Sequence, residues 1–152
     1  METTANKNTA ILMQLSAYTQ YIIPLGNYIF PIIIWSLKKN DSTFVDYNGK
    51  QIINFQLSLL VYNLTLLLIT VPILLYTIFS GMKFHFSVEE DCGWVIDQLT
   101  AGNITWIVVI ALVALGIIVA LKVAEFFLII YAAVKNSNGE NYRYPLTINF
   151  IK

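Results

Sequence analysis

Charged side chains are scarce in this sequence. Lysine and arginine together number 9 of 152 residues and aspartate and glutamate another 9, so that charged residues make up 12% of the chain. An ordinary soluble domain has about 25%. The two signs cancel, which gives no reason to expect a nucleic-acid partner. Hydrophobic residues make up 57% of the chain, and this composition excludes an ordinary soluble class and indicates an integral membrane protein.

Cysteine and histidine are nearly absent. Cys92 is the single cysteine and His85 the single histidine, so one chain can form neither an internal disulfide nor a Cys/His metal cluster. No glycine-rich phosphate loop, Ser/His/Asp grouping or pair of carboxylates facing one cleft is recognisable. We therefore expect no catalytic residues, no metal and no cofactor, and a protein that is not an enzyme.

The hydrophobic residues are gathered into three apolar segments, approximately 11–37, 52–79 and 104–134. The second is about 28 residues long without a charge, and as a helix it can cross a hydrocarbon layer of about 30 Å. The third is about 31 residues long, so it must tilt or protrude. We expect an all-α integral membrane protein in which residues 1–152 form a single membrane domain, a small bundle of these segments.

The first segment is interrupted by Pro24, Gly26 and Pro31, and it has two interpretations. It can be one kinked helix that spans the membrane, because each proline removes a backbone donor. Alternatively it re-enters, with a turn at residues 24–27 and a second half, Tyr28–Leu37, that is too short to cross alone. We favour the kinked span, although re-entry would place Lys7 on the same side as the other lysines.

The polar connections set the expected topology. The connection 38–51 contains Lys38, Lys39 and Lys50 and an Asn48-Gly49 turn signal. The tail 135–152 has three further basic residues and a period of two that is typical of an extended segment, whereas the connection 80–103 is acidic. The positive-inside rule then predicts that 38–51 and 135–152 are cytoplasmic and 80–103 external. Within 80–103, Ser87 and Glu90 fit the capping box of a short surface helix.

Polar residues inside the apolar segments have several interpretations. Lys122 and Glu125 are three residues apart on one helix face and form a candidate intramembrane ion pair, either structural or linked to protons or substrate. Gln56, Asn63 and Thr70 recur every seven residues and can be a packing seam or a polar path. A face of small residues, Gly116, Ala120 and Ala124, is expected to pack against the helix of segment 52–79.

Several motifs together resemble a known family. They are Ile23–Asn27, Pro31–Trp35 followed by two lysines, Ser42–Asp46, Asn48–Gln51, Asn54–Gln56 and Asn138–Ile148. In these the chain resembles the bacterial domain of unknown function 4870 family, small membrane proteins that are similar to the twenty-kilodalton subunit of the chloroplast inner-envelope import translocon. The chain has Asn48 and Gln51 where that family usually has histidine and glutamate, so a titratable role there is not expected.

The resemblance implies a multi-pass protein of the bacterial cytoplasmic (inner) membrane with a cytoplasmic C-terminus, and no activity or ligand. We interpret its motif as architectural: the Asn48-Gly49 turn would place Lys50 at the membrane face, and the amides of Asn54 and Gln56 would bind the tail backbone. Asp46 or Glu140 would pair with Arg143. The candidate partner-binding or structural residues are Asp46, Asn48, Gly49, Lys50, Asn54, Gln56, Glu140, Arg143 and Tyr144.

The expected function is that of a non-enzymatic accessory or scaffold subunit of a larger membrane assembly. Its partners would be the lipid bilayer and other membrane protein subunits, or further copies of itself. The alternative is a small oligomeric transporter or channel, or a component related to protein translocation, with a polar path along Gln56, Asn63 and Thr70. The two differ in whether these side chains face partner helices or a wet lumen.

Overall fold

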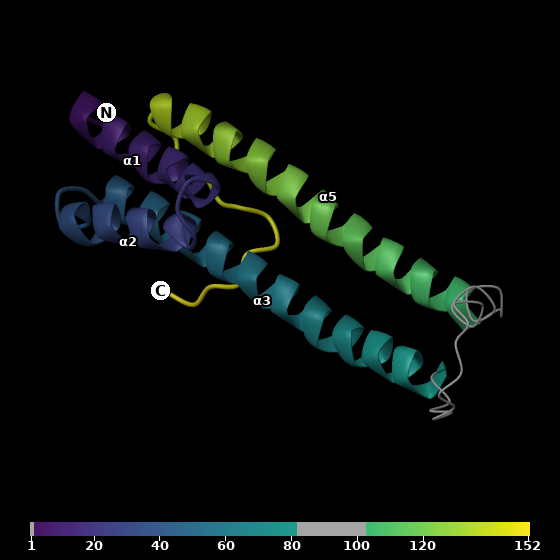
Figure 1. Ribbon diagram of the computed structural model, residues 1–152. Coiled ribbons are helices and arrows are strands. Elements are labelled where there is room, and N and C mark those ends of the chain that lie inside the picture. Colours follow the sequence, from purple (N-terminus) through teal and green to yellow (C-terminus); the bar gives the residue numbers. More distant parts are fainter. Residues whose placement is uncertain (1, 82–102) are drawn as a thin grey trace. The chain divides into compact units, whose positions relative to one another are not determined.

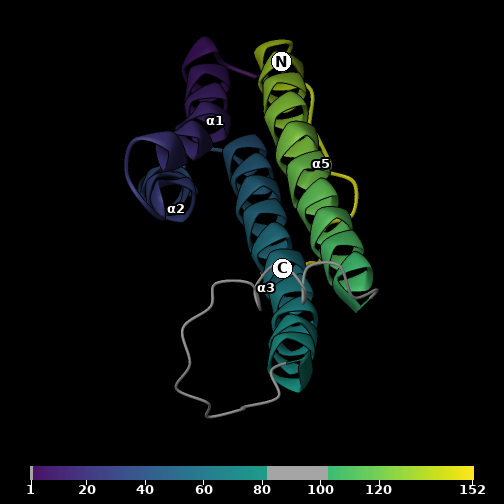
Figure 2. The ribbon, with the colours of Figure 1, turned by 45° about the vertical axis from the view of Figure 1, so that its right-hand side comes forward.

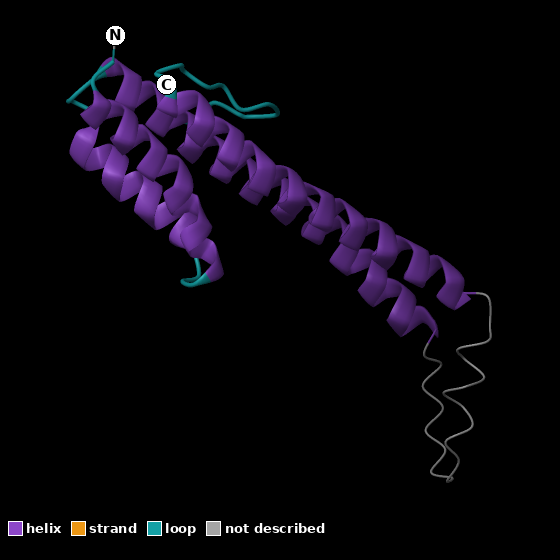
Figure 3. Ribbon diagram, turned by 90° about the horizontal axis from the view of Figure 1, so that it is seen from above, coloured by secondary structure: helices purple, strands orange, loops and turns teal. Residues whose placement is uncertain are grey.

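The computed structural model describes residues 2–81 and 103–152 as helices joined by loops, with no strand in those ranges (Figures 1 and 3). They belong to two compact units: unit 1 is Met1–Tyr62 with Leu121–Lys152, and unit 2 is Asn63–Ala120. Two helices are long and apolar enough to cross a membrane, over Thr43–Tyr76 and Val109–Ser137. The expected helical class is thus confirmed for these residues, whereas the capping box at Ser87 and Glu90 lies outside them.

The first apolar segment is a helical hairpin in unit 1, so the favoured kinked span is wrong. Helix α1 covers Thr4–Ser16, a 3-10 turn η1 covers Ala17–Tyr21, and helix α2 covers Gly26–Lys38. The chain reverses after η1, and α1 and α2 pack against each other (Figures 1 and 2). The Thr3 side chain caps α1 by accepting a hydrogen bond of 3.2 Å from the backbone N–H of Asn6.

Glycine makes the reversal possible. Leu25 has a left-handed backbone, with φ of 64°, and the Ile23 N–H donates to the Thr19 carbonyl over 2.8 Å. A Cβ on Gly26 would lie 2.9 Å from that carbonyl oxygen, closer than packed atoms allow, so the backbone can fold back only at a residue without a side chain. The break therefore follows from the Pro24-Leu25-Gly26 turn rather than from proline acting inside one helix.

Helix α3 covers Thr43–Gly81, and its start corrects the predicted turn at Asn48-Gly49. The Ser42 hydroxyl accepts a hydrogen bond of 3.1 Å from the Phe44 N–H, and Lys50 pairs with Asp46 one turn earlier over 2.6 Å. Both contacts favour a helix over these residues. Gly49 is required by close packing instead of by a turn, because a Cβ there would overlap Trp35.

Helix α5 covers Asn103–Ser137 and ends shortly before Gly139. Gly139 has φ of +79°, the left-handed conformation that commonly follows a helix. The Glu140 N–H donates to the Lys135 carbonyl over 3.0 Å, which satisfies one of the free carbonyls at the helix end.

The core of unit 1 combines α1, α3, α5 and the tail. The Phe55 and Tyr144 rings stack with their centres 4.2 Å apart, so an aromatic residue of the tail fills the space between the helices. The tail is extended, as its period of two predicted, but it forms no strand in the described residues and lies along α3 (Figure 1). The buried apolar members of this core include Ala10, Met13, Ala17, Phe44, Val45, Ile52, Ile53, Leu59, Ile129 and Ala132.

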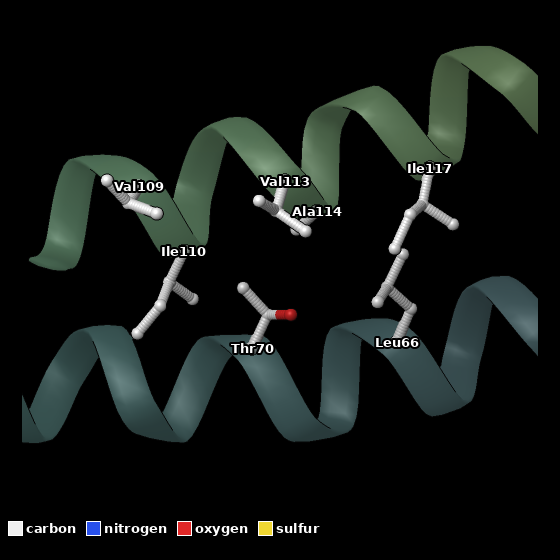
Figure 4. Close-up of a pocket in the computed structure, with 7 residues that line it drawn as sticks. All are labelled: Leu66, Thr70, Val109, Ile110, Val113, Ala114 and Ile117. Carbon is white, nitrogen blue, oxygen red and sulfur yellow. The ribbon is translucent and has the colours of Figure 1, made fainter.

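Unit 2 consists of the remaining parts of α3 and α5. They line an open pocket of about 200 Å³ into which Thr70 places the only hydroxyl among its lining residues (Figure 4). A Cβ on Gly116 would meet nothing within 4 Å, and Ala120 is exposed. The small-residue face therefore does not pack against α3 within the described residues, and that prediction is wrong. The pocket is lined by Leu66, Thr70, Val109, Ile110, Val113, Ala114 and Ile117.

Candidate functional site

Glu125 is the buried carboxylate of unit 1. Its Oε2 accepts from the Lys122 ammonium over 2.8 Å, and its Oε1 accepts from the amides of Gln20 at 2.9 Å and Gln56 at 3.0 Å. Lys122 also donates to the Gln20 side-chain carbonyl over 2.9 Å. The expected pair of Lys122 and Glu125 is thus part of a cluster in which both carboxylate oxygens are hydrogen-bonded, as a buried charge requires.

The same cluster fastens the hairpin to the long helices. Gln20 belongs to η1, and Asn27, at the start of α2, donates to the Gln56 side-chain carbonyl over 2.8 Å. The Tyr18 hydroxyl donates to the Phe126 carbonyl over 2.7 Å. The turn of the hairpin is thereby held against α3 and α5 by polar groups.

A second cluster is centred on the buried amide of Asn48. Its Nδ2 donates to the Phe44 carbonyl and to Asn141 Oδ1, both at 2.9 Å. Its Oδ1 accepts from Asn136 Nδ2 at 2.8 Å and from the Tyr142 N–H at 3.1 Å. One side chain of α3 therefore binds both the end of α5 and the beginning of the tail.

The tail continues along a polar stripe of α3. Asn54 bonds to the tail backbone at Phe150 and Ile151, and its Nδ2 donates to the Ile151 carbonyl over 2.9 Å. One turn later the Ser58 hydroxyl accepts from the Ile148 N–H over 2.8 Å. After another turn the Tyr62 hydroxyl donates to the Leu146 carbonyl over 2.7 Å. Asn54, Ser58 and Tyr62 are four residues apart and share one face of α3.

Tyr144 joins the tail to α1. Its hydroxyl donates to Gln14 Oε1 over 2.7 Å, and the Gln14 amide donates in turn to Asn136 Oδ1 over 3.0 Å. Burial, with smaller contributions from nearby tyrosines and from Glu125, raises the pKa of Tyr144 well above its ordinary value of 10.0. The hydroxyl is therefore a constant donor at physiological pH.

The charged candidates pair differently from the hypothesis. Asp46 bonds to Lys50 and accepts from the Trp35 indole N–H over 2.9 Å, and Glu140 pairs with Lys135 over 2.6 Å. Arg143 joins neither acid within the described residues, so the predicted ion pair that would dock the tail is wrong. The tail is held by neutral amide and hydroxyl groups, which reach its backbone directly.

Gln56, Asn63 and Thr70, which recur every seven residues, have different surroundings in the structure. Gln56 in unit 1 is fully engaged with Asn27 and Glu125, while Thr70 in unit 2 faces a pocket with otherwise apolar lining. The buried Oδ1 of Asn63 has no hydrogen-bond partner. Of the two amides predicted to bind the tail, Asn54 does so and Gln56 does not.

Several residues of these clusters were not among the candidate site residues predicted from the sequence. Gln14 shares the spacing of the buried Ala10, Met13 and Ala17, so its position on the apolar face of α1 was a usable signal. Asn136 lies one turn after the buried Ala132, so it too is a polar residue at the spacing of a buried helix face. The others had no local signal, because their partners are far away in the sequence; they are Gln20, Asn27, Ser58, Tyr62 and Asn141.

These features define a helical membrane protein whose buried polar side chains bond mainly to one another and to the tail. Its two long apolar helices meet the length that a membrane span needs. The chain belongs to the magnetosome magnetite crystal formation protein family, MamF/MmsF, whose model matches residues 5–151. Comparisons with curated proteins and with solved structures gave no significant match.

The family match corrects the resemblance drawn from the sequence. The family is neither domain of unknown function 4870 nor the plastid translocon relative. The residues that suggested them have packing roles: Gly49 admits Trp35, Asn48 bonds to α5 and the tail, and Asn54 binds the tail backbone. Motifs of this kind specify how a small bundle is assembled, so they are a poor guide to a particular family.

Proposed function

We propose that this chain is a non-enzymatic accessory subunit of the magnetosome membrane that contributes to magnetite crystal formation within a larger membrane assembly. The observation that carries the proposal is the match to the family of that name over residues 5–151. Its partners would be the lipid bilayer and other proteins of the same membrane, or further copies of the chain.

The use of polar groups supports an accessory role. Glu125 is neutralised by Lys122 and bonded by two amides, and Asn48 is bonded at both of its side-chain atoms. A catalytic acid or base has to reach a substrate, whereas these groups hold helices and tail together. The candidate partner surface is the outer side of the docked tail, where Ile148 and Phe150 are exposed.

A genetic experiment tests the role. In a host that forms magnetite, cells lacking this chain should form crystals of altered size or shape, and the wild-type gene should restore them, as measured by electron microscopy. The variants Glu125→Gln and Tyr144→Phe should restore the crystals whenever they accumulate to wild-type levels. Unaltered crystals in the deletion strain would contradict the role, and an inactive variant at normal abundance would contradict its non-enzymatic nature.

We propose further that both termini and the 38–42 connection lie on the cytoplasmic side, with the acidic connection 80–103 on the opposite side. Most of the basic residues support this orientation, because Lys7, Lys38, Lys39, Lys50 and Lys135 all belong to unit 1 near the chain ends of the hairpin and of α5. The multi-pass arrangement and the cytoplasmic C-terminus follow from it.

The single native cysteine tests the orientation without further engineering. Cys92 lies in the connection 80–103, so a thiol reagent that cannot cross membranes should label it in intact spheroplasts of cells that carry the chain in the cytoplasmic membrane. In a Cys92→Ser background, Asn138→Cys should be labelled only after the membrane is permeabilised. Labelling of Asn138→Cys in intact spheroplasts would reverse the proposed orientation.

A further inference from the structure

The two chain ends of the α1–α2 hairpin lie at the same end of unit 1. Glu2, before α1, accepts a hydrogen bond of 3.2 Å from the Ser42 hydroxyl, just before α3. The turn at the other end of the hairpin is held through Gln20 to Glu125. Helix α2 has 13 residues, about 20 Å at 1.5 Å per residue, which is less than the hydrocarbon core of about 30 Å. The hairpin cannot cross a bilayer.

The outside of the hairpin is largely apolar, and its exposed polar residues lie toward the chain ends. Ile22 in the turn is 83% exposed and Leu37 on α2 is 74% exposed, and Leu12 on α1 and Ile29 on α2 are also exposed. One protein partner would cover one side of such a surface. Lipid covers all of it, as is normal for a membrane protein.

The polar residues at the end of α2 indicate how deeply the hairpin lies in the bilayer. Lys38 and Lys39 end α2, and the Lys39 ammonium lies 4.9 Å from the centre of the Trp35 ring. Lysine and tryptophan are typical of the membrane interface. With these residues at the headgroups, α2 carries the turn about 20 Å inward, which is close to the midplane of the bilayer.

The hairpin therefore adds protein to one leaflet only. Its helices α1 and α2 have 13 residues each, so neither is long enough to reach through the other leaflet. A helix with its side chains is about 10–12 Å wide, so the two helices of the hairpin add roughly 200 Å² of cross-section to a single leaflet.

We propose that the chain prefers, and at high density produces, membrane curvature in which the leaflet that contains the hairpin is convex.

Membrane tubes pulled from giant vesicles test this preference. The full-length chain is labelled with a dye at Cys92, its single cysteine, and reconstituted in phosphatidylcholine with phosphatidylglycerol. A quencher that cannot cross the membrane reports the orientation in each vesicle, because the proposed orientation puts residue 92 and the hairpin ends on opposite sides. The measured quantity is the protein-to-lipid fluorescence ratio on the tube divided by that on the vesicle.

Protein with the hairpin in the outer leaflet should give a ratio above one, and protein in the reverse orientation a ratio below one. Equal ratios in the two orientations would overturn the proposal. This comparison needs only the wild-type chain, and it is independent of the role in crystal formation because no mineral is present.

Two matched variants test the hairpin itself. Ile29→Ala with Ile33→Ala and Leu37→Ala trims lipid-facing side chains of α2, while Leu64→Ala with Leu68→Ala and Leu75→Ala trims those of α3 in unit 2. All six residues are exposed, so neither change empties the core. With the hairpin outside, the first variant should lower the ratio, and the second should leave it near the wild-type value because the hairpin is unchanged. An equal fall for both variants would contradict the mechanism.

Discussion

Glycine is required at position 49 by the side chains that pack against it and not by its backbone conformation. Glycine inside a helix costs about 0.5–1 kcal/mol relative to alanine, yet a Cβ here would overlap Trp35 and lie 3.2 Å from the Met13 sulfur. Gly116 lies in α5, where an added Cβ would meet nothing within 4 Å. The two glycines thus share a helical setting and differ only in the space beside them.

We predict opposite effects of alanine at these two positions. Gly49→Ala should lower the free energy of unfolding by about 2 kcal/mol, because Trp35 and the hairpin must shift. Gly116→Ala should raise it by up to about 1 kcal/mol through the higher helix propensity of alanine. Thermal unfolding in detergent, followed by circular dichroism, measures both. A stabilising Gly49→Ala would disprove the close contact with Trp35.

Tyr144 gives a prediction about pH. Tyr144→Phe removes the bond to Gln14 and should lower the free energy of unfolding by about 1 kcal/mol at neutral pH. Burial raises the pKa of Tyr144 above 10.0, so the contribution of the hydroxyl is complete below about pH 10 and is lost as the pH rises through the folded-state pKa. The difference between wild type and variant should therefore stay constant up to about pH 10 and shrink above it.

Chemical unfolding in detergent at a series of pH values measures this difference. Tyr21→Phe is the control, since Tyr21 is exposed, and it should leave stability unchanged below pH 10. A difference for Tyr144→Phe that already fell between neutral pH and pH 9 would contradict the assignment.

Single residues were predictable only where the signal was local. Lys122 and Glu125 are three residues apart and do pair, and the spacing alone predicted it. Gln14 and Asn136 also bond, but 122 residues separate them, and amides have no charge that would indicate a partner at a distance. The predicted ion pair of Arg143 was wrong because Asp46 and Glu140 pair instead with two lysines, Lys50 and Lys135.

The tail and α3 form a unit at the scale of elements. Asn54 makes three hydrogen bonds to the tail backbone, at Phe150 and Ile151. We predict that Asn54→Ala releases the last residues of the tail and lowers stability by about 1–3 kcal/mol, because it leaves backbone groups without partners. Faster digestion by carboxypeptidase, followed by mass spectrometry, measures the release.

Asn149→Ala is the matched control, because Asn149 is an exposed asparagine of the same tail. Its digestion rate should equal that of the wild type. If Asn54→Ala were digested no faster than this control, the bonds from Asn54 would not be what retains the tail.

The elements themselves were partly predictable. The two long apolar helices followed from the length and composition of the segments 52–79 and 104–134. The beginning of α3 did not, because an Asn-Gly pair is ordinarily a turn signal and only the contact with Trp35 reveals another reason for Gly49. The hairpin was missed because prolines are compatible both with a kink and with a break, and the steric limit at Gly26 appears only after folding.

At the scale of the whole molecule, Glu125 connects three parts of the chain: η1 through Gln20, α3 through Gln56 and α5 through Lys122. We predict that Glu125→Ala lowers the free energy of unfolding by about 2–3 kcal/mol, because the two amides lose their acceptor and Lys122 loses its counter-charge. Hydrogen exchange of η1 should increase at the same time.

Glu140→Ala is the comparison for this prediction. Glu140 also pairs with a lysine, but its side chain is 53% exposed, against 2% for Glu125. Solvent screens an exposed pair, so this variant should unfold nearly as the wild type does. Equal losses for the two variants would mean that burial of Glu125 adds nothing to its pair.

The way in which α3 holds the tail has one more consequence. Asn54, Ser58 and Tyr62 bond to main-chain atoms of residues 146–151 and to none of their side chains. Retention of this segment is therefore largely independent of its local sequence. Ile148 and Phe150, which are both exposed, can be replaced by other residues that tolerate an extended backbone while the segment stays bound. They are thus positions at which a reporter group or a binding epitope can be attached to a fixed scaffold.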